Sequence, residues 1–311
     1  MSPIEFFDTH TYRMVFFGTA VIGLVAGALG PFVYLRKQSL MSDVISHAAL
    51  PGALLAFLSA VLLFGTDGRN MLGLIVGAVV IGTLAALAAN AITRVSKIAI
   101  DTAMAVVLTF FFGVGMLLLS VITNGPFPGK GGIQDYLFGN ASVITLADLV
   151  TSVSVGGIAL VITALFWKEF AVRTFDADLA VVLGFRARSI DTLLFITIVI
   201  ATVIGVKAVG LVLMVAFVIT PPAAARQWVS SLRGLVALSA AIGAVGSGVG
   251  AYLSISWGGV PTGPVIVLTL FAIFACSLLF SPRRSVLTRA RARRRARLAL
   301  RDSLLGAGGV R

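Results

Sequence analysis

The sequence predicts an all-α, polytopic helical membrane protein with about nine transmembrane spans, including broken helices. Its mean hydropathy is +1.06, and 59% of its 311 residues are apolar while only 12% are charged, a composition far from that of soluble globular domains. Apolar runs of about 20 residues recur along the chain, which is the length that crosses a bilayer as a helix. A membrane β-barrel would instead show shorter strands of alternating polarity.

Nine apolar runs predict the spans. Lys207 follows the sixth run closely, so the sixth and seventh runs also fit one long, broken helix. Small residues four positions apart predict close helix packing at Gly23 and Gly27, Gly73 and Gly77, and Gly246 and Gly250. The runs lie at residues 14–35, 43–64, 70–93, 102–122, 146–167, 192–206, 209–228, 234–255 and 263–280.

The basic residues divide the loops into two groups. With nine spans, only Arg13, Arg69, Lys130 and Lys207 fall on the N-terminal side of the membrane. Because cytoplasmic loops are rich in Lys and Arg, we expect the N-terminus outside and the C-terminus in the cytoplasm. The opposite side carries Arg36, Lys37, Arg94, Lys97, Lys168, Arg173, Arg186, Arg188, Arg226, Arg233 and the C-terminal tail.

Two regions follow from this pattern, a membrane domain at residues 1–281 and a basic cytoplasmic tail at residues 282–311. The arginine-rich tail contributes much of the net charge of +12. Directly after a span, such a tail pairs most simply with anionic lipid headgroups, so we expect membrane lipids rather than nucleic acid as its partner, with regulation as an alternative. The lone Cys276 excludes a disulfide framework and a thiolate-rich site for soft metals.

The second span begins with an acid and one of the two histidines of the chain, Asp43 and His47. At this spacing the two side chains share one helix face, so an oxygen and an imidazole nitrogen can reach one ligand. Ionisable residues within a membrane are costly and mark functional sites. Oxygen and nitrogen donors suit a divalent first-row ion such as manganese, iron or zinc. The alternative is structural, with Asp43 capping the helix and His47 bonded to a backbone carbonyl.

Proline interrupts two spans in roughly corresponding halves of the chain, at Pro51 and at Pro221 and Pro222. Each proline removes a backbone hydrogen bond, and broken helices in matched positions are typical of a substrate path between them. Ser46, Pro51 and Pro221 are therefore candidates for the transport path. A simple packing kink is the alternative.

A long segment at residues 174–191 separates the fifth and sixth spans on the basic side. Asp176 or Thr174 can cap a short helix there, which Gly184 would end. Such a helix fits a soluble partner or the bilayer interface. Its apolar face would consist of Leu179, Val182 and Leu183.

Three other acids, Asp101, Asp148 and Asp191, stand at predicted span starts, and we interpret each as a helix N-terminal residue favoured by the helix dipole. Ser247 between two glycines is weak support for an intramembrane hydrolase that would use His47 as its base.

The stretch at residues 40–52 resembles the second-helix signature of the ABC-3 metal-permease family of ATP-binding-cassette importers. Four more stretches match in the right order, so the resemblance covers nearly the whole chain to about Ser281. The arginine-rich tail departs from the short ends typical of the family. The four stretches are residues 136–139, 175–191, 206–226 and 261–264.

The resemblance implies a permease of the bacterial plasma (inner) membrane that imports manganese, iron or zinc, with Asp43 and His47 as ion ligands. The second-helix motif of this chain resembles that of the manganese and iron branch of the family more than that of the zinc branch. It also implies three partners: a cytoplasmic ATP-binding subunit pair, a second permease subunit (a copy or a paralogue) and an extracytoplasmic metal-binding protein. The ATPase would contact Asp176, Leu179, Val182, Leu183 and Gly184.

The sequence agrees with a subunit that is not itself an enzyme and binds no permanent cofactor, because it lacks a phosphate-binding loop of the form Gly-x-x-x-x-Gly-Lys-Ser/Thr. ATP hydrolysis is then expected in a separate partner. Two alternatives stay open: a zinc permease of the same family, and a secondary metal transporter in which Asp43 and His47 relay protons.

Overall fold

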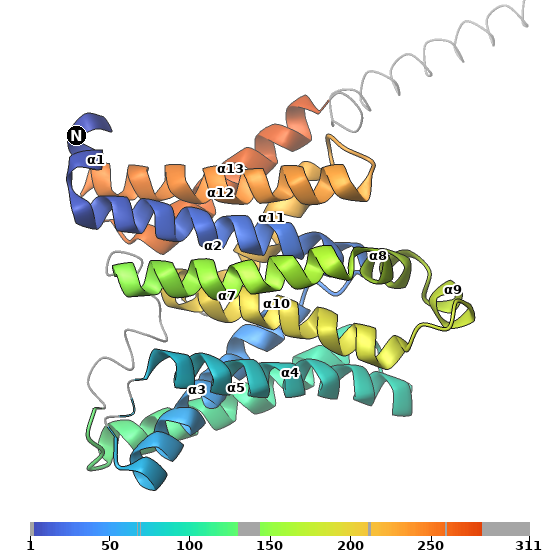
Figure 1. Ribbon diagram of the computed structural model, residues 1–311, viewed down its shortest axis with the longest axis horizontal. Helices are drawn as coiled ribbons and strands as arrows, with labels where there is room; N and C mark the ends of the chain where they lie inside the picture. The colour runs from blue at the N-terminus through green and yellow to red at the C-terminus, as the bar shows by residue number, and fades with distance from the viewer. Residues whose placement is uncertain are drawn as a thin grey trace, which may run out of the picture.

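The computed structural model describes residues 3–66, 68, 70–129, 144–210, 213–258 and 260–281, and within them the secondary structure is helical throughout (Figure 1). The helices are α1 (Pro3–Asp8), α2 (His10–Leu35), α3 (Met41–Phe64), α4 (Met71–Val95), α5 (Ile100–Asn124), α7 (Leu146–Leu165), α8 (Trp167–Phe175), α9 (Ala177–Val182), α10 (Ala187–Val209), α11 (Met214–Ala225), α12 (Leu232–Trp257) and α13 (Thr262–Phe280).

The long helices form three groups, which Figure 1 shows one above another. Helix α2 packs on α12, with α11 and α13 beside them, while α7 and α10 form the middle group. Helices α3, α4 and α5 pack on one another, and α10 joins them to the rest. The N-terminal α1 lies at the opposite end of the bundle from α8 and α9 (Figure 1).

Eight of the described helices are long and apolar enough to cross a membrane, so the predicted multi-pass membrane fold is confirmed. The seventh predicted span is occupied by α11, whose 12 residues extend about 18 Å, less than the roughly 30 Å of a bilayer core. Where the sequence predicts about nine spans, the described residues therefore contain eight full-length helices and the shorter α11.

The prolines lie inside helices rather than at breaks. Helix α3 continues through Pro51, and α11 contains both Pro221 and Pro222. The interruption between the sixth and seventh predicted spans instead begins at Gly210, which has a φ of 82°, a value that glycine adopts without strain. Pro222 leaves the carbonyl of Val218 without its helical donor, and this carbonyl packs directly against Gly30 of α2.

The predicted glycine contacts form a seam between α2 and α12. A Cβ atom at Gly23 would lie 2.2 Å from the carbonyl oxygen of Gly243, and one at Gly27 would lie 2.4 Å from that of Ser239. The Ser239 hydroxyl donates a hydrogen bond of 2.6 Å to the carbonyl of Gly27. The two backbones therefore approach each other closely at these positions, as expected for small residues at helix interfaces in membranes.

The other predicted glycine pairs also pack closely, with one exception. Gly77 of α4 faces Gly52 of α3, while Gly246 and Gly250 of α12 face α13. Among the described residues, a Cβ atom at Gly73 would meet only Asn70, at 3.9 Å, so no contact of this glycine with another described helix is seen.

Candidate metal-ion site

Asp43 and His47 lie on one face of the first two turns of α3, as their spacing predicts. The Nε2 atom of His47 is 3.4 Å from Oδ1 of Asp43, and the two side chains are 14% and 28% exposed. Two ligands about 2.1 Å from a shared ion are separated by about 3.0 Å in octahedral and about 3.4 Å in tetrahedral coordination. The pair thus has the separation of two ligands of one ion without any change of side-chain position.

The hydrogen bonds of the structural alternative are absent from the described residues. Leu40 is the N-cap of α3 and Asp43 makes no side-chain cap. The Nδ1 atom of His47 is buried without a hydrogen-bond partner. The edge of Phe112 on α5 packs against the imidazole, with ring centroids 4.9 Å apart. Asp43 is thus partly exposed, and His47 contacts Asp43 and the ring of Phe112, which leaves the pair available for a ligand.

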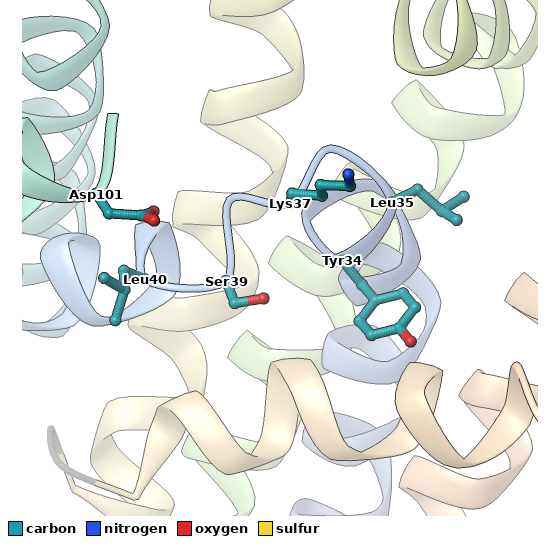
Figure 2. A pocket seen from close by; sticks show the side chains of 6 residues that line it. All are labelled: Tyr34, Leu35, Lys37, Ser39, Leu40 and Asp101. Atoms are coloured by element: carbon teal, nitrogen blue, oxygen red, sulfur yellow. The ribbon is translucent and has the colours of Figure 1, made fainter. Parts of the chain in front are cut away.

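The site lies near the start of α3, beside the connection from α2. Figure 2 shows Leu40 and Ser39 beside Asp101, at the start of α5, around an open cavity of about 530 Å³. His47 comes seven residues after Leu40, which corresponds to about 10 Å along a helix. Asp43 and His47 are thus the third and the seventh of the 24 residues of α3.

No third acid, histidine or cysteine joins the pair in the described part of the chain, where no group of three such residues is found. The backbone provides one further candidate ligand atom for an ion. Pro51 has no N–H, so the carbonyl of His47 loses its helical hydrogen bond. This carbonyl is a candidate ligand in addition to the ring nitrogen of the same residue. The remaining ligands of an ion would have to come from outside this set.

The three candidates for the transport path have different environments. Ser46 is buried, and its hydroxyl donates to the carbonyl of Ser42 at 2.6 Å. Pro51 is buried next to Gly115 of α5, where a Cβ atom would lie 3.0 Å from its ring. Pro221 is buried in α11. All three are thus in the interior of the bundle, although Ser46 uses its only donor within its own helix.

The predicted short helix on the basic side is α9. Asp176 caps it, because its Oδ1 accepts hydrogen bonds from the N–H groups of Asp178 and Leu179 at 3.1 and 2.9 Å. Gly184 follows its C-terminus with a φ of 79°. The predicted apolar face is exposed, with Val182 at 82%. The other exposed apolar side chains of this segment are Phe175, Leu179, Val181 and Leu183.

The prediction for the acids at span starts is correct for two of the three. Asp148 forms a capping box with Thr145 at the start of α7, and Asp101 lies in the first turn of α5. The prediction for Asp191 is wrong, because α10 begins at Ala187 and Asp191 lies in its second turn. There it binds Arg36, Arg94 and Arg173. Sequence reasoning missed these contacts, since the nearest of the three in the chain is 18 residues away.

Two further sequence features have different outcomes. The hydroxyl of Ser247 is buried without a hydrogen-bond partner and faces Gly23, so the described structure contains no Ser247–His47 pair for a hydrolase. The basic tail at 282–311 and the motif at 136–139 lie outside the described residues.

The chain matches a family of known transporters. The sequence profile of the ABC 3 transport family matches residues 8–281. The chain belongs to the ABC 3 transport family. This membership confirms the resemblance seen in the sequence and covers every described helix from α2 to α13.

Individual members of the family are similar along most of the chain. The zinc transport system membrane protein TroC of Treponema pallidum is 38% identical over 95% of this chain and 97% of its own length. The manganese transport system membrane protein MntC of Bacillus subtilis is 36% identical over 89% of this chain, a match that spans 62% of that longer protein. The solved structure of PsaBC from Streptococcus pneumoniae in complex with Fab has a TM-score of 0.79, at 31% identity, over 93% of this chain and all of its own.

Proposed function

We propose that this chain is the membrane permease subunit of an ATP-driven importer of divalent transition-metal ions, and that Asp43 and His47 bind the ion during its passage. The observation that carries the proposal is the pair itself. Its two donor atoms are 3.4 Å apart, the other ring nitrogen has no partner, and the chain belongs to a family whose similar members are named as zinc and manganese transport proteins.

We propose manganese as the transported ion, with iron or zinc as the alternatives. A carboxylate, an imidazole and a backbone carbonyl form a hard to borderline set that suits manganese, while a softer ion would favour thiolates. Cys276 is distant in sequence and exposed on α13. The names of the relatives support both manganese and zinc, so a competition assay is required.

The ligands missing from the pair would come from water, from the freed carbonyl of His47 or from a second permease subunit across a symmetry axis. The two subunits would be copies or paralogues. Helix α5 offers a surface for such contact, because Val106, Phe110 and Leu117 are each more than half exposed. Lipid would cover the same surface in a monomer.

The apolar surface of α9 is proposed as the contact with a cytoplasmic pair of ATP-binding subunits. With this assignment the N-terminus lies outside and the C-terminus in the cytoplasm, because α8 and α9 lie at the end of the bundle opposite the N-terminal α1 (Figure 1). An extracytoplasmic metal-binding protein would deliver the ion to the opposite end. The basic tail would contact anionic lipid headgroups.

Transport into sealed vesicles tests the proposal. The vesicles contain the permease and its ATPase, and the loaded binding protein is supplied on the outer side, with manganese, iron and zinc in competition. We expect uptake that requires ATP and is strongest for manganese. Uptake that follows an imposed proton gradient and ignores ATP would overturn the proposal in favour of a proton-coupled secondary transporter.

A further inference from the structure

The strongest ionic contacts of the described structure converge on Asp191, which lies buried near the start of α10. Its Oδ1 accepts hydrogen bonds from Arg36 at 2.7 Å and from Arg173 Nε at 3.0 Å. Its Oδ2 accepts one from the terminal nitrogen of Arg173 at 2.7 Å, and Arg94 approaches it at 3.5 Å. We call these four residues the Asp191 cluster.

Each arginine of the Asp191 cluster comes from a different part of the chain. Arg36 follows the last residue of α2, Arg94 lies at the end of α4, and Arg173 lies on α8. Arg173 also donates to the carbonyl of Ala177, the first residue of α9, at 3.3 Å. One carboxylate therefore joins the exposed α9 segment to the ends of helices from all three groups of the bundle.

The contacts within the cluster differ in strength. The side chains of Asp191, Arg36 and Arg173 are 7%, 13% and 12% exposed, and buried charges of this kind are stable only while they stay paired. The hydrogen bond with Asp191 raises the pKa of the Arg173 guanidinium above its usual value. Arg94 is 53% exposed and its contact is longer, so it contributes little.

Arg36 is also the first residue of the connection between α2 and α3. Lys37 follows it with a left-handed φ of 55°, a conformation that costs a lysine energy. The N–H of Gln38 bonds back to the carbonyl of Val33 at 3.1 Å, which closes a Schellman motif with lysine in place of the usual glycine. The connection ends at Leu40, three residues before Asp43.

The α2–α3 connection has room to move. The cavity of about 530 Å³ borders Lys37, Ser39 and Leu40 and separates them from close packing on that side (Figure 2). On its other side, α8 packs on the end of α2, where Phe32 and Phe170 have ring centroids 6.0 Å apart. The connection is thus held by the Asp191 cluster and by α8, and it is open towards Asp101.

We propose that Asp191 is a positioning residue for transport, which transmits movement of α9 through Arg173 and Arg36 to the α2–α3 connection and so to Asp43 and His47. This inference rests on the proposed function, because it takes α9 as the ATPase contact. It adds a mechanical route from that contact to the ion ligands. The route consists of Arg173, Asp191 and the five residues Arg36–Leu40.

The test measures manganese uptake and ATP hydrolysis in the same vesicles, with permease, ATPase and loaded binding protein present. The variants are Asp191→Asn, Arg173→Gln and, as a matched control, Asp101→Asn, an exposed acid at the same end without an ion pair among the described residues. We expect the first two to raise the number of ATP molecules hydrolysed per ion by about tenfold, while the ATPase still co-purifies. The control should keep the wild-type ratio.

The ratio separates coupling from mere stability. A misfolded fraction would lower uptake and stimulated hydrolysis together and leave the ratio unchanged, and that result would overturn the proposal. Should Asp191→Asn fail to assemble, Arg173→Lys decides, because it keeps the charge but loses the two-point contact; an unchanged ratio there counts against the route. Wild-type vesicles without ATP-driven uptake would instead overturn the proposed function, whatever the variants do.

Discussion

Two acids of this membrane protein lie near the same end of the bundle and have opposite environments. Asp43 is 28% exposed and has one neighbour of possible charge, His47, at 3.4 Å. Asp191 is 7% exposed and accepts from two arginines at 2.7 Å and approaches a third. The first acid has capacity for a ligand, and the second has none left.

The difference shows how burial and pairing separate a binding site from a structural one. A carboxylate with few partners keeps lone pairs for an ion. The Nδ1 atom of His47 likewise has no hydrogen-bond partner. A carboxylate surrounded by guanidinium groups attracts no cation and joins the elements that supply the arginines. The predictions below test this contrast.

The largest expected effect is on Asp43 and His47. Asp43→Asn or His47→Ala should lower manganese uptake by at least about 100-fold, because even groups behind a metal ligand change affinity by about 10- to 100-fold. Uptake into vesicles measures this, and purification of the intact complex shows that assembly persists. Asn90→Ala is the matched control, since its amide bonds only to the carbonyl of Ala86 on the same helix. Near-normal uptake in either site variant would remove the pair from the transport path.

The second prediction concerns stability. Asp191→Asn should lower the free energy of unfolding by about 3–5 kcal/mol, because Arg36 and Arg173 lose their buried partner. Asp43→Asn should change it by less than about 1 kcal/mol, as for a site without such contacts. Denaturant unfolding of the solubilised permease, followed by tryptophan fluorescence, measures both. Equal losses in the two variants would mean that the contrast between the two acids is false.

The third prediction addresses the backbone of His47. Pro51→Ala restores an N–H that can bond the carbonyl of His47, so this oxygen would no longer be free to bind an ion. If it binds the ion, uptake should fall by roughly tenfold, which corresponds to about 1.4 kcal/mol. Gly52→Ala is unsuitable as a control, since a Cβ there would lie 2.5 Å from the carbonyl of Gly77. Ala53→Ser, a smaller change on the same turn of α3, is used as the control instead. Unaltered uptake in Pro51→Ala would exclude the carbonyl as a ligand.

The smallest effect is expected within the Asp191 cluster. Arg94→Gln should lower the unfolding free energy by less than about 1 kcal/mol, because its contact is long and half exposed. Arg36→Gln, measured in the same unfolding experiment, should cost several times more. A larger loss of unfolding free energy for Arg94→Gln than for Arg36→Gln would show that Arg94 is the stronger partner of Asp191.

The sequence was sufficient to predict features that depend on local spacing. The spans, the shared face of Asp43 and His47 and the cap of Asp176 each depend on residues within a few positions, so helix geometry determines them. The contacts of Asp191 join residues 155, 97 and 18 positions apart. Such pairings depend on which helix ends meet, and neither hydropathy nor charge pattern contains that information.

The predicted helix break at Pro221 and Pro222 was also misplaced because packing contacts cannot be read from the sequence. Proline suggested a break at residues 221 and 222, but close packing of Val218 against Gly30 accommodates both prolines inside α11. The chain turns at Gly210 instead. A proline indicates only a missing hydrogen bond, and its neighbours decide whether the helix bends there.

The seam between α2 and α12 restricts how this transporter can open. Where Gly23 faces Gly243 and Gly27 faces Ser239, the two backbones meet directly. The side chains at these contacts are small, and the Ser239 hydroxyl bonds across the seam to the carbonyl of Gly27. Close backbone contact at these positions leaves little freedom for α2 and α12 to slide past each other, so we expect the two helices to move as one unit during transport.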